Sequence, residues 1–212
     1  MCKGHGQHRG VRLQLSDLIG NRHIVTVSGA RKGAGKTALA EILLRNLPQF
    51  AAIKITITDK DLAVIDDERD IMTPATDTCR MKQSGAVQVV WVRSTEDHLR
   101  DSMMVALGKM VPCQGILIEG NSILRHLRPT FAFFVIAPPF GVMKPSRLHA
   151  IKNADLAVIN QINGMDPDRE LVQGIEAFNP RLTILRLNLL NPGMPGDDYN
   201  RLLSLLKQRV HD

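Results

Sequence analysis

The sequence predicts an α/β fold, with a doubly wound, mostly parallel sheet of about seven strands and helices on both faces. Short β-branched runs alternate with segments whose apolar residues recur at helical spacing. Runs such as residues 115–119 and 156–160 are almost continuously apolar, as strands covered on both faces must be. The 212 residues contain no internal repeat or long linker, so we expect one domain over residues 11–212 behind a mobile polar arm at residues 1–10.

The strands are predicted from short apolar or β-branched runs bounded by turn residues. They comprise residues 24–28, 51–58, 87–92, 115–119, 131–136, 156–160 and 182–189. Leucines at helical spacing predict helices over residues 37–47 and 198–210. A capping box of Ser94 and Asp97 is expected to open another helix, whose apolar face includes Leu99, Met103 and Leu107.

The first predicted strand runs through a glycine-rich turn into an amphipathic helix. Gly33 and Gly35 let backbone N–H groups approach a phosphate chain without a Cβ atom in the way, and the helix N-terminus adds partial positive charge. Lys36 would reach the β- and γ-phosphates, and the Thr37 hydroxyl would bind Mg²⁺. This context predicts a phosphate-binding loop (P-loop) for GTP or ATP. Its predicted nucleotide-binding residues are Gly33, Ala34, Gly35, Lys36, Thr37 and Ala38.

The loop departs from the usual pattern at its first position, where Ala30 replaces glycine and Gly29 lies one place earlier. Alanine is tolerated there if its φ is negative. Arg31 stands where the loops of signal-recognition and partition-type NTPases carry a signature lysine. It is therefore a candidate catalytic residue that contacts a phosphate of its own or a second subunit, and a solvated loop charge is the alternative.

Two acids are candidates for the metal and for catalysis. Glu119 ends an apolar strand, where a carboxylate commonly holds nucleotide-bound Mg²⁺. Asp77 follows an acidic stretch that includes Asp59 and Asp70, and such a stretch is often only a solvated loop or hairpin. We favour Asp77 and Glu119 over Asp59. The predicted metal ligands are Thr37, Asp77 and Glu119, and the predicted catalytic residues are Arg31, Lys36, Asp77 and Glu119.

Four segments together resemble the small P-loop GTPases of molybdopterin-guanine dinucleotide biosynthesis, the MobB-type adapter proteins. They are the P-loop; Ala-Ile-Lys-Ile-Thr at 52–56, where the family has Val-Ile-Lys-His; Asp-Thr-Cys-Arg-Met-Lys-Gln-Ser-Gly-Ala at 77–86, similar to the family's Asp-Ser-x-Arg-x-x-x-Ala-Gly-Ala; and Leu-Ile-Glu-Gly at 117–120, similar to its Val-Glu-Gly. The resemblance covers residues 22–122. Departures are Ile55 in place of histidine, and Asn121-Ser122 after the glutamate and glycine.

The resemblance implies a homodimeric nucleotide-binding protein with weak intrinsic GTPase activity that helps load molybdopterin with GMP. In related GTPases an Asn-Lys-x-Asp motif after a late strand reads guanine. Here the corresponding residues are Asn160-Gln161-Ile162-Asn163, which lack the lysine and the aspartate. Asn160 and Asn163 are therefore candidate base contacts without the charge that makes guanine selection sharp, and ATP remains an alternative to GTP. Both could instead cap a turn.

The formal charge of +6 comes from 27 basic and 21 acidic residues, and the excess lies in residues 1–50. A bound nucleotide would neutralise much of it, and one Trp, one Tyr and six Phe offer little base stacking, so nucleic acid is an unexpected partner. Three spaced cysteines and the absence of a long apolar run favour a cytoplasmic protein without a membrane partner. The residues Cys2, His5 and His8 could bind a soft metal, although a polar arm is the simpler interpretation.

Three functions remain open from the sequence. The first is a Mg²⁺-dependent NTPase that hydrolyses GTP or ATP slowly as an adapter for a cofactor-assembly enzyme. The second is a small-molecule kinase that uses ATP, whose acceptor site would comprise Asn121, Ser122, Arg125 and Arg128. The third is a partition-like nucleic-acid ATPase.

Overall fold

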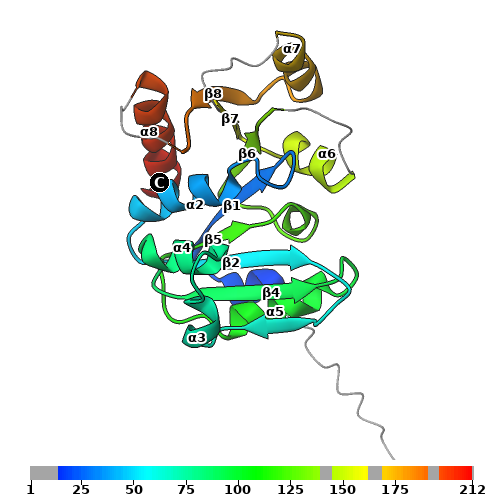
Figure 1. Ribbon diagram of the computed structural model, residues 1–212, viewed down its shortest axis with the longest axis vertical. Coiled ribbons are helices and arrows are strands. Elements are labelled where there is room, and N and C mark those ends of the chain that lie inside the picture. Colours follow the sequence, from blue (N-terminus) through cyan, green and yellow to red (C-terminus); the bar gives the residue numbers. More distant parts are fainter. Residues whose placement is uncertain (1–13, 139–144, 162–168, 191–195, 212) are drawn as a thin grey trace, which may run out of the picture.

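The computed structural model describes residues 14–138, 145–161, 169–190 and 196–211. An eight-stranded sheet runs through the molecule with helices on both sides (Figure 1). Its order is β3-β4-β2-β5-β1-β6-β7-β8. The strands are β1 (His23–Gly29), β2 (Phe50–Ile57), β3 (Ala63–Ile65), β4 (Val89–Ser94), β5 (Gly115–Glu119), β6 (Phe131–Ile136), β7 (Leu156–Asn160) and β8 (Thr183–Leu187). The predicted α/β fold with a mostly parallel sheet is confirmed.

Every strand pair in the described residues is parallel except β3–β4. Strand β1 lies between β5 and β6, so the chain after β1 builds the sheet in one direction and the chain after β5 builds it in the other. Loops at the carboxyl ends of such strands diverge at this switch point and leave room for a ligand. The predicted glycine-rich loop follows β1 at this point.

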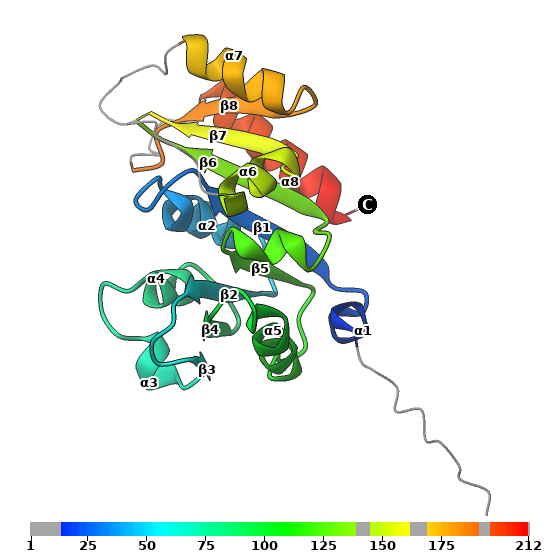
Figure 2. The same cartoon turned by 90° about the vertical axis from the view of Figure 1, so that its right-hand side faces the viewer.

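Helices cover the two faces of the sheet separately (Figure 2). One face packs against α2 (Lys36–Arg45), α3 (Glu68–Ile71), α4 (Asp77–Gln83) and α8 (Asp197–His211). The other face packs against α1 (Leu15–Ile19), α5 (Leu99–Gly108), the 3₁₀ helix η1 (Ser122–Arg125), α6 (Pro145–Lys152) and α7 (Arg169–Phe178). We call them the α2 face and the α5 face.

Side chains alternate between these faces along each central strand. In β5, Leu117 joins the apolar cluster on the α2 face, whereas Ile116 and Ile118 join the cluster on the α5 face. In β2, Ala52 lies on the α2 face and Ile53 on the α5 face. The same alternation places residue 54 and residue 119 on the α2 face, beside the helix that follows the glycine-rich loop.

The fold differs from the sequence-based expectations in two places. Strand β3 is an eighth strand, in the acidic segment that was expected to be a loop or hairpin, and it is the antiparallel edge of the sheet. The predicted capping box of Ser94 and Asp97 is wrong, because neither residue caps the helix. Ser94 is the last residue of β4 and is buried, and its hydroxyl accepts a hydrogen bond from Ser102 at 2.9 Å. The helix begins only at Leu99, where no side chain caps it.

No helix in the described part of the chain combines the length and the apolarity needed to cross a bilayer. The predicted arm at residues 1–10 and the possible metal ligands Cys2, His5 and His8 lie outside the described residues.

Candidate functional site

The glycine-rich loop links the end of β1 to the start of α2 and needs its glycines for conformation and for space. Gly33 and Gly35 have φ values of 76° and 105°, which L-residues rarely adopt. A Cβ atom on Gly35 would lie 2.6 Å from Nδ2 of Asn160. Ala30 does not have a positive φ, and its N–H donates to the Val135 carbonyl at 2.9 Å. The departure at Ala30 is therefore compatible with the loop.

Two buried or half-buried asparagines attach this loop to neighbouring strands. Asn121 accepts a 2.8 Å hydrogen bond from the Gly29 N–H and donates one of 3.0 Å to the Gly29 carbonyl. Asn160, only 1% exposed, donates to the Ala34 carbonyl at 3.1 Å and accepts from the Leu189 N–H at 3.0 Å. The start and the centre of the loop are therefore held from β5 and β7.

Arg31 links the loop to the end of β6. Its guanidinium donates to the carbonyls of Ala137, at 3.3 Å, and Pro138, both directly after β6. The Lys36 ammonium donates to the Arg31 carbonyl at 3.2 Å, so it lies over the loop. Burial holds the pKa of Lys36 below its ordinary value even though the Glu119 carboxylate favours the charged form.

Four polar side chains converge beside this loop, and we call them the acid–lysine cluster: Thr37, Lys54, Asp77 and Glu119. The Thr37 hydroxyl lies 2.9 Å from Oδ1 of Asp77 and 3.0 Å from Oε2 of Glu119. The Lys54 ammonium lies 2.6 Å from Oδ2 of Asp77 and 2.5 Å from Oε1 of Glu119. Each carboxylate therefore bridges the hydroxyl and the ammonium.

The positions of these side chains follow from the sheet and helix geometry. Lys54 in β2 and Glu119 in β5 are direct partners in the parallel register, so their side chains emerge side by side on the α2 face. Thr37 is in the first turn of α2, and Asp77 is the first residue of α4, which packs against α2. Adjacent strands and packed helices thus bring four segments to one point.

The charges in the cluster support one another. Burial alone would lower the pKa of Lys54, but the two carboxylates outweigh it and the pKa is raised. Burial alone would raise the pKa of Asp77, but the hydrogen bond and charge of Lys54, with the Thr37 hydroxyl, hold it below its ordinary value. Lys54 and Asp77 are therefore both ionised at neutral pH.

The oxygen atoms of the cluster suit a hard divalent cation. The Thr37 hydroxyl has one hydrogen, but two carboxylate oxygens lie within hydrogen-bond distance of it. The hydroxyl can donate to only one of them, so the other contact joins two oxygen atoms without a hydrogen between them. A cation that binds oxygen ligands satisfies such a group, and Mg²⁺ prefers one or two carboxylates plus phosphate oxygens and water. The described residues contain no group of three or more His, Cys, Asp or Glu able to hold a metal alone. The donor set fits Mg²⁺ bound together with a nucleotide.

The structure brings together four of the predicted site residues: Lys36, Thr37, Asp77 and Glu119. Asp59 is exposed after β2. The Asn160 side chain donates one hydrogen bond to the loop and accepts one from Leu189. Its contact with a base stays a prediction. Asn163 lies outside the described residues.

Lys54 was missing from the predicted site. The sequence does carry a sign of its role, because Lys54 is the single basic residue in the otherwise apolar run Phe50–Ile55. A charge in a buried strand needs a buried counter-charge. Ile55, where the resembled family has histidine, faces the α5 face and packs against Gly120. This departure from the family therefore lies away from the acid–lysine cluster.

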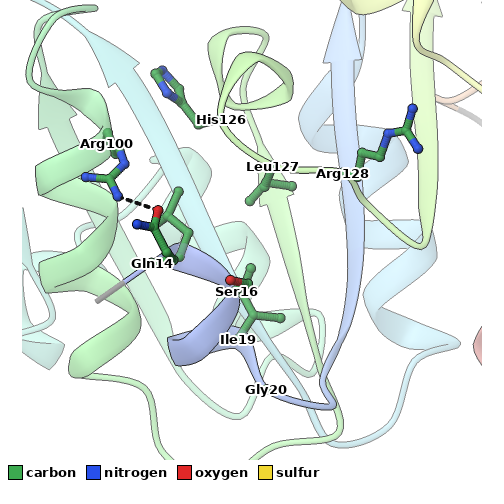
Figure 3. A pocket seen from close by; sticks show the side chains of 9 residues that line it. Gln14, Ser16, Ile19, Gly20, Arg100, His126, Leu127 and Arg128 are labelled. Atoms are coloured by element: carbon green, nitrogen blue, oxygen red, sulfur yellow. Dashed lines mark hydrogen bonds between the residues drawn. The ribbon is translucent and has the colours of Figure 1, made fainter. Parts of the chain in front are cut away.

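The residues proposed for an acceptor site have other partners. The Ser122 hydroxyl donates to Glu96 at 2.6 Å, and Arg125 pairs with the same carboxylate at 3.5 Å. Arg128 lines a separate cavity of about 430 Å³ on the α5 face, with Gln14 and Arg100 joined by a 2.9 Å hydrogen bond (Figure 3). Burial, with the nearby arginines, lowers the pKa of His126 in its wall. This cavity shares no residue with the glycine-rich loop.

Two solved structures have the same architecture. The hydrogenase maturation factor HypB from Archaeoglobus fulgidus superposes with a TM-score of 0.52 at 14% identity, over 92% of this chain and 95% of that one. HypB from Helicobacter pylori in complex with nickel gives 0.57 at 14% identity, over 90% and 88%. This chain therefore shares with these two proteins the fold of a mostly parallel α/β sheet covered by helices on both faces. No protein-family model matches the chain, and no curated protein matches its sequence.

Proposed function

We propose that this protein is a Mg²⁺-dependent P-loop NTPase that binds GTP or ATP and hydrolyses it slowly. The observation that carries the proposal is the convergence of Lys36 and Thr37, at the start of α2, with the carboxylates of Asp77 and Glu119. This arrangement offers backbone donors, one ammonium group and oxygen ligands to a nucleotide's phosphates and metal.

Within this site the residues have separable roles. The N–H groups from Gly33 to Ala38 and the Lys36 ammonium would bind the phosphates, and Thr37, Asp77 and Glu119 would hold Mg²⁺. Bound Mg²⁺ would neutralise part of the phosphate charge. Arg31 could add charge only after leaving its contacts with Ala137 and Pro138.

Slow hydrolysis is expected from the state of the two acids. The carboxylates of Asp77 and Glu119 both contact the Lys54 ammonium, and a carboxylate held by an ammonium is a poor general base. Positioning and charge neutralisation then supply most of the rate. We accordingly propose that a protein partner accelerates the reaction.

The biological role that we propose is an adapter in metallocofactor assembly, with molybdenum cofactor as the first candidate. Two independent likenesses support it: the motifs at residues 22–122 resemble the molybdopterin-guanine dinucleotide adapters, and the fold matches hydrogenase maturation factors, one of them in complex with nickel. The same resemblance leads us to propose a homodimer, which sedimentation of the full chain tests.

The proposal is tested by titrating fluorescent GTP and ATP analogues with and without Mg²⁺. Lys36→Ala removes the ammonium that faces the phosphates, so we expect affinity to fall about a hundredfold, the loss of about two charge-assisted contacts. Lys152→Ala, an exposed lysine at the end of α6, is the matched control and should bind like the unchanged chain. Failure of the folded protein to bind either nucleotide refutes the proposal, and rapid phosphoryl transfer to a metabolite replaces it with a kinase.

A further inference from the structure

Lys54 occupies the position in the acid–lysine cluster where a cation's charge is needed. Its ammonium contacts the same two carboxylates, Asp77 and Glu119, that offer oxygen ligands beside Thr37. The Lys54 side chain is 14% exposed and that of Glu119 is 1% exposed. Removing one partner of a pair this deeply buried leaves an uncompensated charge, so the ammonium and the carboxylates hold one another in place.

Charge counting shows what this pairing does to metal binding. In the two ion pairs, one ammonium, that of Lys54, faces the two carboxylates of Asp77 and Glu119. A divalent cation entering alone must displace or face this ammonium, and the two together bring three positive charges to two carboxylates in a largely buried place. A triphosphate brings about four negative charges, which reverse that balance.

We propose that Lys54 is an internal counter-cation that competes with the divalent metal for Asp77 and Glu119 and thereby makes metal binding depend on the nucleotide's phosphates. Lys54 acts through the two carboxylates, so it is a positioning residue. The proposal rests on the proposed nucleotide-binding function, and it predicts that the site discriminates between free metal and metal bound to nucleotide.

The experiment measures Mn²⁺ binding to the nucleotide-free full-length chain by electron paramagnetic resonance. The unchanged chain should bind Mn²⁺ weakly, and Lys54→Met should bind it about tenfold more tightly or better, because the competing charge is gone. Lys152→Met, which removes an exposed lysine on the α5 face, should match the unchanged chain. A folded Lys54→Met chain that binds Mn²⁺ equally or more weakly overturns the proposal, because a merely structural lysine gives that result.

A second measurement follows the coupling between the two ligands. Adding a non-hydrolysable triphosphate should raise Mn²⁺ affinity more in the unchanged chain than in Lys54→Met, and equal increases contradict the proposal. Lys54→Gln, which can still donate hydrogen bonds to both acids, replaces the Met variant if that one does not fold. A chain that binds no nucleotide refutes the proposed function, while the nucleotide-free comparison still decides the role of Lys54.

Discussion

The two faces of the sheet differ in chemical character where Lys54 of β2 pairs with Glu119 of β5. On the α2 face, Lys54 and Glu119 form an ion pair beside the glycine-rich loop. One residue earlier in each strand, Ile53 and Ile118 lie on the α5 face and are fully buried in an apolar cluster. A shift of one residue therefore separates an ion pair from a hydrophobic core, because successive strand side chains point to opposite faces.

The largest expected effect is a loss of stability when a charge is removed from the α2 face. Glu119→Gln keeps the shape of the side chain but removes a buried charge that faces Lys54, so we expect the free energy of unfolding to fall by about 3 kcal/mol. Urea unfolding measures this. The double variant Lys54→Met/Glu119→Gln also removes the ammonium that has lost its buried partner, and it should recover part of the loss, because the remaining carboxylate of Asp77 is 41% exposed and can be hydrated. Stability unchanged in the single variant would show that the pair contributes nothing.

A smaller effect is expected where the α2 face meets the loop. Asn160→Ala leaves the Ala34 carbonyl and the Leu189 N–H without their partner, which should cost about 2 kcal/mol. Hydrogen exchange at the Leu189 amide should also become faster. Asn21→Ala, at an exposed asparagine, is the control and should change stability by less than about 0.5 kcal/mol. Unchanged exchange at Leu189 would argue against the link between loop and sheet.

The smallest expected effect is the loss of stability when a buried methyl group is removed from the α5 face. Ile118→Val removes one buried methyl group beside Glu119 but on the opposite side of β5, and it should cost about 1 kcal/mol. Mn²⁺ and nucleotide affinities should not change, because the side chain points away from the cluster. A clear change in either affinity would show that the two faces are coupled through the strand.

The parallel strands were predictable because strands buried on both faces must be apolar throughout. Residues 115–119, 131–136 and 156–160 are strands with the predicted bounds. Strand β3 was missed because three residues between acidic segments carry too little pattern, and only pairing with β4 makes them a strand. The predicted cap at Ser94 is wrong because a local motif cannot show that β4 continues through this residue.

The site was predictable where residues follow a local motif and not where they depend on distant partners. The loop glycines, Lys36 and Thr37 stand within one short segment, and Glu119 ends a recognisable strand. Lys54 has no such motif, because its partners Asp77 and Glu119 lie 23 and 65 residues further along the chain. Only the register of β2 with β5 shows that its charge is compensated.

Strand β5 fits between β1 and β2, although both of those strands precede it in the chain. Thr37 and Glu119, which are 82 residues apart, therefore meet only after β5 has entered the gap. Contacts this distant in sequence form late and slowly, because the long intervening chain loses entropy before the contact forms. During synthesis, the glycine-rich loop emerges early, but the acid–lysine cluster should stay incomplete until Glu119 has left the ribosome.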